Sequence, residues 1–200
     1  MEKIDSIGSY INVEGLDFYF GGCQTCDKRC CDGKMGYAIT PLIVDDFEEV
    51  YKHFPILFAT INDVFRPVML LNDGNSKCSY LDENGMCSIY EQRPPSCKLY
   101  PVSPLFDQIF IDSNCPSVSG EIVGEKIIEN GKVVGGFYHK RLENFPQKLQ
   151  KTSDVMKELV ADENSFEVIG EVSGVILFKY VGSIENDYIQ MHHNSLLHLE

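Results

Sequence analysis

The chain has 200 residues, of which 44% are hydrophobic, and a formal net charge of -13. This length and apolar content predict one compact unit rather than several domains. A chain this acidic does not attract phosphate backbones or anionic lipid, so we expect no nucleic-acid partner and no membrane partner.

The N-terminal segment MEKIDSIGSYI contains acidic residues and no apolar run of signal-peptide length. The longest apolar stretches, 65–71 and 175–181, are too short to span a bilayer. We therefore expect a soluble protein located in the cytoplasm.

Short strands and one helix are predicted in the first part of the chain. Asp45 has the features of a helix N-cap, with Glu48 completing a capping box, and Pro55 stops or restarts that helix. The segments that favour extended structure are 16–20, 37–44 and 67–71.

The segment 78–101 contains two further local signals. Asn84-Gly85 favours a tight hairpin turn. Ser88 with Glu91 offers a second capping box for a short helix, which Pro94 and Pro95 would end, leaving Cys97 just beyond it.

The remaining elements alternate between strand and helix patterns. A strand is predicted over 105–112, a hairpin about Asn130-Gly131 over 125–134, and a helix over 138–162 with a break near Pro146. Two more strands are expected over 166–169 and 175–181. The C-terminal His192-His193 pair, in a polar tail, is expected to be solvated surface. The fold class is therefore α+β.

The cysteines are the main chemical signal of the chain. Four of the eight lie within nine residues, behind a Gly21-Gly22 pair that allows a tight turn. In a cytosolic protein such an array usually holds metal, whereas an oxidising compartment would favour disulfides, and free cysteines also occur in cores. The candidate metal ligands are Cys23, Cys26, Cys30, Cys31, Cys78, Cys87, Cys97 and Cys115.

The spacing of these thiols bears on the number of metal centres. Cys23 and Cys26 can point two sulfurs at one ion. Cys30 and Cys31 are adjacent, and neighbours project oppositely from an extended backbone, so we expect two centres or one polynuclear centre. Eight thiolates would satisfy two four-coordinate zinc ions, adding a charge of about -4. The candidates to offset it are Lys28, Arg29, Arg93 and Lys98.

The pattern Cys-x2-Cys-x3-Cys-Cys, followed by the segment 78–101 and by Cys115-Pro116, resembles the bacterial CxxCxxCC cysteine-cluster family (YkgJ type) over about residues 18–118. One departure is visible, because three residues rather than two precede Cys30-Cys31. The resemblance implies a zinc- or iron-chelating domain. The family also includes flagellin lysine N-methylases, which have a similar cluster. Cys115-Pro116 resembles the closing Cys-Pro of ferredoxin-like motifs, which favours an iron-sulfur cluster.

The sequence therefore predicts a cysteine-cluster metal-binding region over 1–118 and a hairpin, helix and strands over 119–200, packed as one compact unit. The preferred function is metal binding that mainly supports the fold, with a surface for a protein partner or ligand. The alternatives are an enzyme of the protein-lysine N-methylase or redox type, and a metal-handling or sensing protein. No nucleotide-binding loop or hydrolase motif is present. His139 and the pair Asp45-Asp46 are expected to be structural rather than catalytic.

Overall fold

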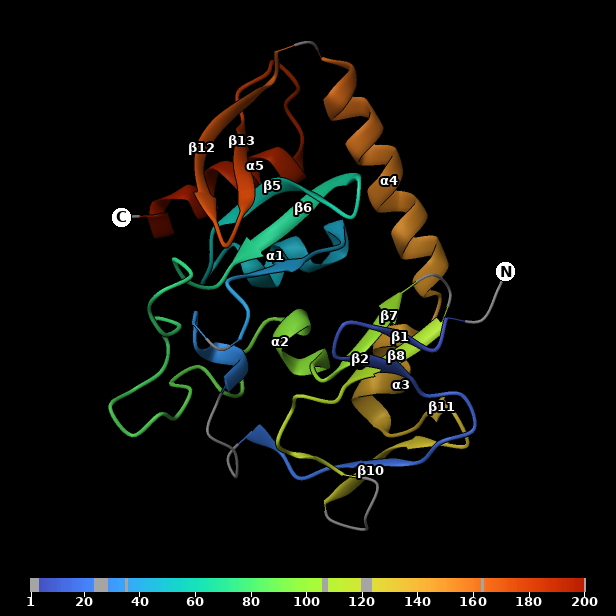
Figure 1. Cartoon of the computed structure of the whole chain (residues 1–200). Coiled ribbons are helices and arrows are strands. Elements are labelled where there is room, and N and C mark those ends of the chain that lie inside the picture. Colours follow the sequence, from blue (N-terminus) through green and yellow to red (C-terminus); the bar gives the residue numbers. More distant parts are fainter. Residues whose placement is uncertain are drawn as a thin grey trace. The chain divides into compact units, whose positions relative to one another are not determined.

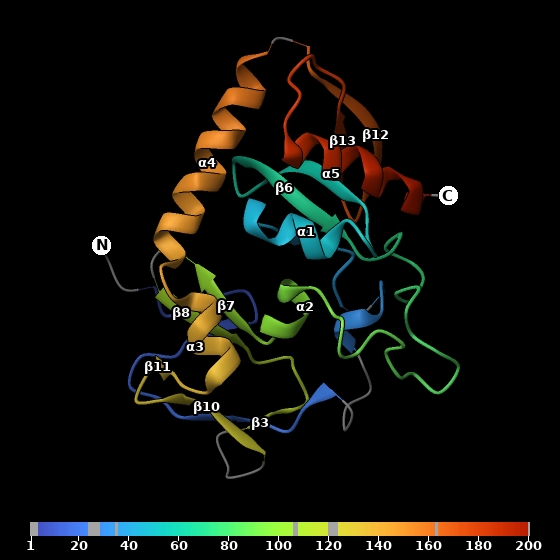
Figure 2. The same ribbon diagram turned by 180° about the vertical axis from the view of Figure 1, so that it is seen from behind.

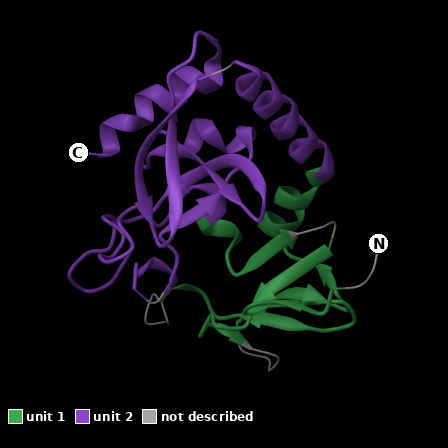
Figure 3. Ribbon diagram, turned by 45° about the horizontal axis from the view of Figure 1, so that its top comes forward, with its two compact units in different colours: residues 1–29, 97–145 green, residues 30–96, 146–200 purple. Residues whose placement is uncertain are grey.

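The structure is a computed structural model that describes residues 4–23, 29–34, 36–105, 108–119, 124–162 and 164–199. Within these residues, short strands form three antiparallel sheets accompanied by helices, which confirms the α+β class (Figure 1). The chain divides into two compact units, and each is assembled from two separate stretches of sequence (Figure 3). Unit 1 comprises 1–29 and 97–145, and unit 2 comprises 30–96 and 146–200.

Unit 1 contains two four-stranded sheets in its described residues, with strand orders β1-β2-β8-β7 and β11-β10-β3-β9. Unit 1 is seen from behind in Figure 2. Its strands are β1 (Ser6–Ile7), β2 (Tyr10–Asn12), β3 (Phe18–Phe20), β7 (Val102–Leu105), β8 (Gln108–Asp112), β9 (Val118–Ser119), β10 (Glu125–Glu129) and β11 (Lys132–Val133), and they are accompanied by the helix α3 (Gly136–Leu142). The core between them is made by Val13, Leu99, Val102, Ile111, Ile127, Ile128 and Tyr138.

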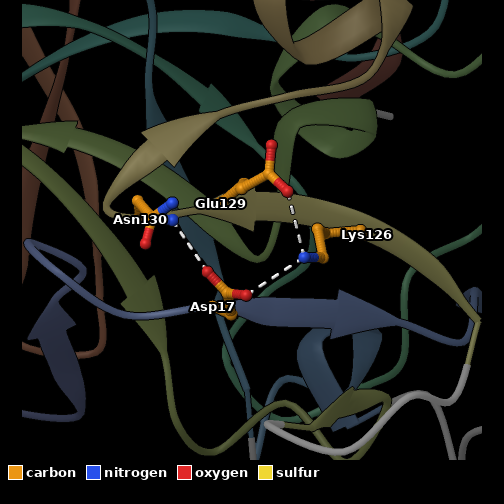
Figure 4. Close-up of polar contacts among 4 residues, drawn as sticks. All are labelled: Asp17, Lys126, Glu129 and Asn130. Carbon is orange, nitrogen blue, oxygen red and sulfur yellow. Dashed lines mark hydrogen bonds and ion pairs between the residues drawn. The ribbon is translucent and has the colours of Figure 1, made fainter.

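The predicted hairpin about Asn130-Gly131 is confirmed as the β10–β11 turn, in which both residues have positive φ. Asp17 holds this turn: its Oδ1 accepts from the Asn130 backbone N–H at 2.7 Å and its Oδ2 from Lys126 Nζ at 3.0 Å (Figure 4). Lys126 also donates to Glu129 at 3.2 Å. The Asn130 hydrogen bond, followed by that from Lys126, lowers the pKa of Asp17. The carboxylate thus stays ionised and fixes the hairpin against the β3 lead-in.

Unit 2 is built on a five-stranded sheet of order β12-β13-β5-β6-β4. Its elements are the strands β4 (Ile39–Pro41), β5 (Ile56–Ile61), β6 (Val64–Leu70), β12 (Phe166–Val172) and β13 (Val175–Tyr180), the 3-10 turns η2 (Arg29–Cys31), η3 (Val44–Asp46) and η4 (Leu196–Leu199), and the helices α1 (Phe47–Val50), α4 (Phe145–Ala161) and α5 (Asp187–Ser195). Among the described helices, none combines the length and apolar character that a membrane crossing requires.

Alternation along β5 divides the core of unit 2 into two faces. Phe58 packs with Met156 and Leu159 of α4 and with Ile189 of α5. Leu57 and its neighbours Ala59, Val68 and Leu177 form the cluster on the opposite face. Because successive side chains of a strand point to opposite faces, the near-continuous apolar run of β5 is consistent with burial on both sides.

His192 was expected to be solvated, and this prediction is wrong. The tail forms α5, capped by Asn186, whose Oδ1 accepts from the Ile189 N–H at 3.0 Å. His192 is fully buried: its Nδ1 lies 2.7 Å from Ile56 O, and its Nε2 accepts from the Tyr180 N–H at 3.1 Å. Burial lowers the pKa of His192 to about 4. The ring is therefore neutral, with Nδ1 as the donor.

The position of this ring follows from the pairing of β5 and β13. Phe178 lies opposite Phe58, so the antiparallel register, extended by two residues, sets Tyr180 opposite Ile56. The imidazole of His192 bonds to both of those backbone groups. It therefore replaces the ladder hydrogen bond at the point where direct pairing between the two strands ends.

Two helix predictions are corrected by the structure. Asp45 is not the N-cap: it lies in η3, α1 begins at Phe47, and Asp45 forms an ion pair with Lys151 of α4. Pro95 does not end a helix but begins α2 (Pro95–Leu99), which contains Cys97. Proline is compatible with the first turn of a helix, where its missing N–H has no intrahelical acceptor to bond.

Three strand predictions can also be compared with the structure. The stretch after Pro55 is β5, which was not predicted. The strand expected over 105–112 corresponds mainly to β8, whereas β7 shares only Leu105 with that range. The predicted strands over 166–169 and 175–181 are confirmed as β12 and β13. The break in the helix over 138–162 falls at Asn144, which has φ 54°, and Pro146 lies in the first turn of α4.

Candidate metal centre

Cys30 and Cys31 lie in η2, and their Sγ atoms are 3.8 Å apart. The expectation that these neighbours project oppositely is wrong, because the backbone here is a 3-10 turn rather than extended. Four thiolates bound tetrahedrally at about 2.3 Å from a zinc ion are spaced by about 3.8 Å. The pair therefore has the separation of two ligands that share one metal atom.

A second segment carries Cys78 alongside this turn. The Cys78 N–H donates to Cys31 O at 2.8 Å. The adjacent residues Asp32 and Lys77 form an antiparallel bridge. This pairing brings together two cysteines that are 47 positions apart in the sequence.

Cys87 is brought back toward Cys78 by the predicted Asn84-Gly85 turn. Leu81 and Cys87 form an antiparallel bridge, and Gly85 has φ 71°. Asp82 closes the turn, since its Oδ1 accepts from the backbone N–H groups of Asn84 at 2.9 Å and Met86 at 2.7 Å. The turn expected from the sequence is thus present, although the segments on either side of it are joined by an isolated bridge and do not form strands.

The environment of Cys78 disfavours a bare thiolate. Burial raises the pKa of Cys78 to about 11, with smaller contributions in the same direction from Cys31 and Cys87. A cation at this position would favour the thiolate over the thiol, because coordination stabilises the deprotonated sulfur. The thiol set therefore suits a ligand that supplies positive charge.

Gly33 is needed where the two cysteine-bearing segments meet. Its N–H donates to Ser76 O at 2.9 Å, and a Cβ at this position would lie 2.5 Å from both Ser76 O and Asn72 Oδ1. Gly33 was not among the predicted functional residues, and the only signal for it in the sequence is a glycine two positions after Cys31.

We expect Gly33→Ala to lower the free energy of unfolding by about 1–3 kcal/mol, because the added methyl group pushes the paired backbones apart. Chemical denaturation measures the change. Gly170→Ala, in β12 of the same unit, is the matched control, since a Cβ there meets nothing within 4 Å. Equal stability of the two variants would contradict the close approach at Gly33.

In unit 1, the segment before Cys23 pairs with the segment after Cys115. The Gly21 N–H donates to Ser117 O at 2.9 Å. The Ser117 hydroxyl donates to Gly22 O at 2.9 Å. Cys23 and Cys115 are therefore carried by hydrogen-bonded neighbouring segments.

The buried Asp112 carboxylate orders the turn that contains Cys115. Its Oδ2 accepts from the Tyr100 hydroxyl at 2.8 Å, and its Oδ1 from the Asn114 N–H at 3.0 Å. The Asp112 carbonyl oxygen accepts from the Cys115 N–H at 3.1 Å. Asp112 and Tyr100 thus order the segment that carries Cys115, a role that the sequence did not predict for Asp112.

The structure brings some of the predicted ligands together and leaves others outside its description. Cys26 and Lys28 lie outside the described residues, as does the side chain of Arg29. No disulfide joins any two of the seven described cysteines. Among the described residues, no three or more Cys, His, Asp or Glu side chains converge as an ion-holding group.

Arg93, proposed above to offset thiolate charge, packs on an aromatic ring. Its guanidinium carbon lies 3.8 Å from the centroid of the Tyr90 ring, and its Nε donates to Tyr90 O at 2.9 Å. Cation–π stacking and the carbonyl bond hold the side chain in one orientation. Arg93 thus stabilises the turn between Cys87 and Cys97.

In the described residues, cysteine-bearing turns are paired through backbone hydrogen bonds and bridges on an α+β scaffold. Residues 22–116, which include all eight cysteines, match the model of the CxxCxxCC family, described as a putative zinc- or iron-chelating domain. The match covers the segment whose cysteine spacing predicted a resemblance to this family. No curated protein and no solved structure shows a significant match to the chain.

Proposed function

We propose that this protein binds zinc or iron through its eight cysteines and that the metal mainly holds the fold together. The observation that carries the proposal is the Cys30–Cys31 turn, with its sulfurs 3.8 Å apart and the Cys78 N–H bonded to Cys31 O. Thiols clustered in this way, with no disulfide among the seven described cysteines, usually coordinate a metal.

The ligands divide into two sets of four in this proposal. Cys30, Cys31, Cys78 and Cys87 all belong to unit 2. The other four, Cys23, Cys26, Cys97 and Cys115, fall in the stretches 1–29 and 97–145. Four thiolates complete one tetrahedral shell, so each set would supply the ligands of one ion.

The separation of the ligands along the chain supports a structural role. The unit 2 set extends from Cys30 to Cys87, and an unfolded chain does not present such residues together. Binding free energy then becomes folding free energy. The thiols must also stay reduced, which fits a cytoplasmic location.

The sulfur separation also bears on the type of centre. Two thiolates at 3.8 Å fit one metal atom, as in a zinc site or at one iron of a two-iron cluster. In a four-iron cube each iron holds one cysteine, so the sulfurs are spaced further apart. We therefore favour zinc, with a two-iron cluster as the iron alternative.

Elemental analysis of protein purified without oxygen tests this proposal directly. We expect about two zinc ions per chain and a colourless solution, because zinc has a filled d shell. If the protein instead contains iron and absorbs visible light, we would conclude that the same cysteines hold an iron centre rather than zinc. A folded, metal-free protein with four mapped disulfides would refute metal binding altogether.

A further inference from the structure

A cavity of about 520 Å³ lies beside the long helix of unit 2. It is formed by α4, by the start of β6 and by Leu42, which follows β4. Figures 1 and 2 both show α4 running next to the β5–β6 hairpin. The volume falls within the range of about 300–1,000 Å³ that is usual for small-molecule sites.

The wall of this cavity is apolar, and part of it is open to solvent. Leu42 and Met156 line it as buried side chains. Val64, Leu149 and Val160 also line it, although they are 50%, 41% and 53% exposed. Large apolar side chains that gather around one hollow while exposed are a feature of binding surfaces.

The charged residues of the lining are both cationic. Among the described residues around the cavity, Arg66 and Lys157 carry charge and no lining residue is acidic. Lys157 pairs with the exposed Asp154 at 3.1 Å. An exposed ion pair of this kind is held weakly and leaves the ammonium available to another anion. A positive lining is unusual for a chain with a net charge of -13.

Arg66, the other cationic residue of the lining, has an unpartnered donor among the described residues. Its Nε is buried and has no hydrogen-bond partner in the described part of the chain. Burial lowers the pKa of Arg66, although a guanidinium keeps its charge at any physiological pH. A buried donor without an acceptor is destabilising, so an acceptor from outside the chain would relieve the cost.

We propose that this cavity binds a small carboxylate with an apolar chain, of the medium-chain fatty-acid type. The carboxylate pairs with Arg66, whose planar guanidinium matches it, and Lys157 adds positive charge. The chain lies against the apolar wall that includes Leu42 and Met156. This site is separate from the cysteines, so the inference does not depend on the proposed metal.

Decanoate is the probe that tests the proposal, titrated into the full-length protein by calorimetry and followed by methyl NMR. We expect saturable binding of one decanoate per chain, with shifts confined to methyl groups around the cavity. Neutral 1-decanol, which lacks the carboxylate, should bind at least about tenfold more weakly. Equal affinity for the two compounds would overturn carboxylate recognition, and non-saturable uptake would overturn a defined site.

Two substitutions test separately whether the Arg66 charge and the apolar cavity are needed for decanoate binding. Arg66→Gln removes the cation and should weaken decanoate binding by about tenfold or more. Ser153→Trp should abolish binding by filling the cavity, and the fold should survive because Ser153 is exposed. Lys179→Gln is the charge-matched control, since this β13 lysine pairs with Glu167 and does not line the cavity.

The proposal fails if decanoate binds Arg66→Gln and Ser153→Trp as tightly as it binds the unaltered protein. If Arg66→Gln unfolds, as circular dichroism would show, Ser153→Trp still decides whether the ligand enters this cavity. A concentration-dependent dimer that excludes decanoate would show instead that a second copy of the chain covers this face.

Discussion

Replacing Cys87 by serine is expected to remove one metal ion per chain and to lower the melting temperature by about 10 °C or more. A structural zinc site contributes on the order of 10 kcal/mol to the folded state of a small domain. Losing even a third of that is a large change, since about 1 kcal/mol moves the melting temperature of a domain this size by about 2–4 °C. Metal content and thermal unfolding are measured on the same preparation.

Met86→Ser is the matched control for this experiment. It removes the neighbouring sulfur-containing side chain from the same turn, but Met86 is exposed and a thioether is a weak ligand beside thiolates. We expect it to keep both the metal and the melting temperature. Chelation of the unaltered protein should remove both ions and lower the melting temperature at least as far as Cys87→Ser does.

The same comparison with Cys97→Ser tests the other ligand set. If each set holds its own ion, Cys97→Ser and Cys87→Ser should each remove about one ion. Loss of all metal from either variant would indicate one polynuclear centre instead. A cysteine variant that loses metal but keeps full stability would contradict the structural role and would mark an open, functional position.

His192→Ala is expected to cost about 3–5 kcal/mol of unfolding free energy. The substitution leaves a cavity beside Phe58, whose ring centroid lies 5.0 Å from that of the imidazole. It also removes the partners of Ile56 O and of the Tyr180 N–H. Denaturant unfolding gives the value. His193→Ala, at the exposed neighbour, should cost less than about 1 kcal/mol, and similar losses for both variants would contradict the bridging role.

The buried imidazole also predicts how stability depends on pH. The pKa of His192 is lowered to about 4 in the folded protein, whereas an unfolded histidine titrates near 6.5. Between these values the unfolded chain binds the additional proton, so the stability contributed by the neutral ring is lost as pH falls from about 6.5 to 4. The difference in unfolding free energy between the unaltered protein and His192→Ala should therefore decrease over that interval, by an amount on the order of 3 kcal/mol. A constant difference would show that His192 does not titrate differently in the two states.

Local signals in the sequence were sufficient for several elements. Asn130-Gly131 and Asn84-Gly85 predicted turns that the structure confirms, because these residues tolerate positive φ wherever they occur. The segments of β12 and β13 have the apolar pattern of strands, and the cysteine spacing predicted the family resemblance that the match over residues 22–116 supports. Each of these signals depends only on residues close together in the chain.

Other features could not be obtained from local patterns. Pro95 begins α2 rather than ending a helix, since a proline signal is compatible with either role until the neighbouring turns are known. His192 has the sequence context of a surface tail, but α5 packs on the sheet and places the ring between two backbones. The adjacency of Cys31 and Cys78 comes from a bridge at Asp32 and Lys77, for which the sequence contains no signal.

The sequence by itself therefore determined the chemistry of this protein: eight thiols, their spacing, a net charge of -13 and an α+β pattern. Only the tertiary structure decided which thiols meet, which histidine is buried and where an apolar cavity has a cationic lining. The physical reason is that dihedral preferences and periodicity act within a few residues, whereas these contacts join segments that only the packing of the whole chain brings together.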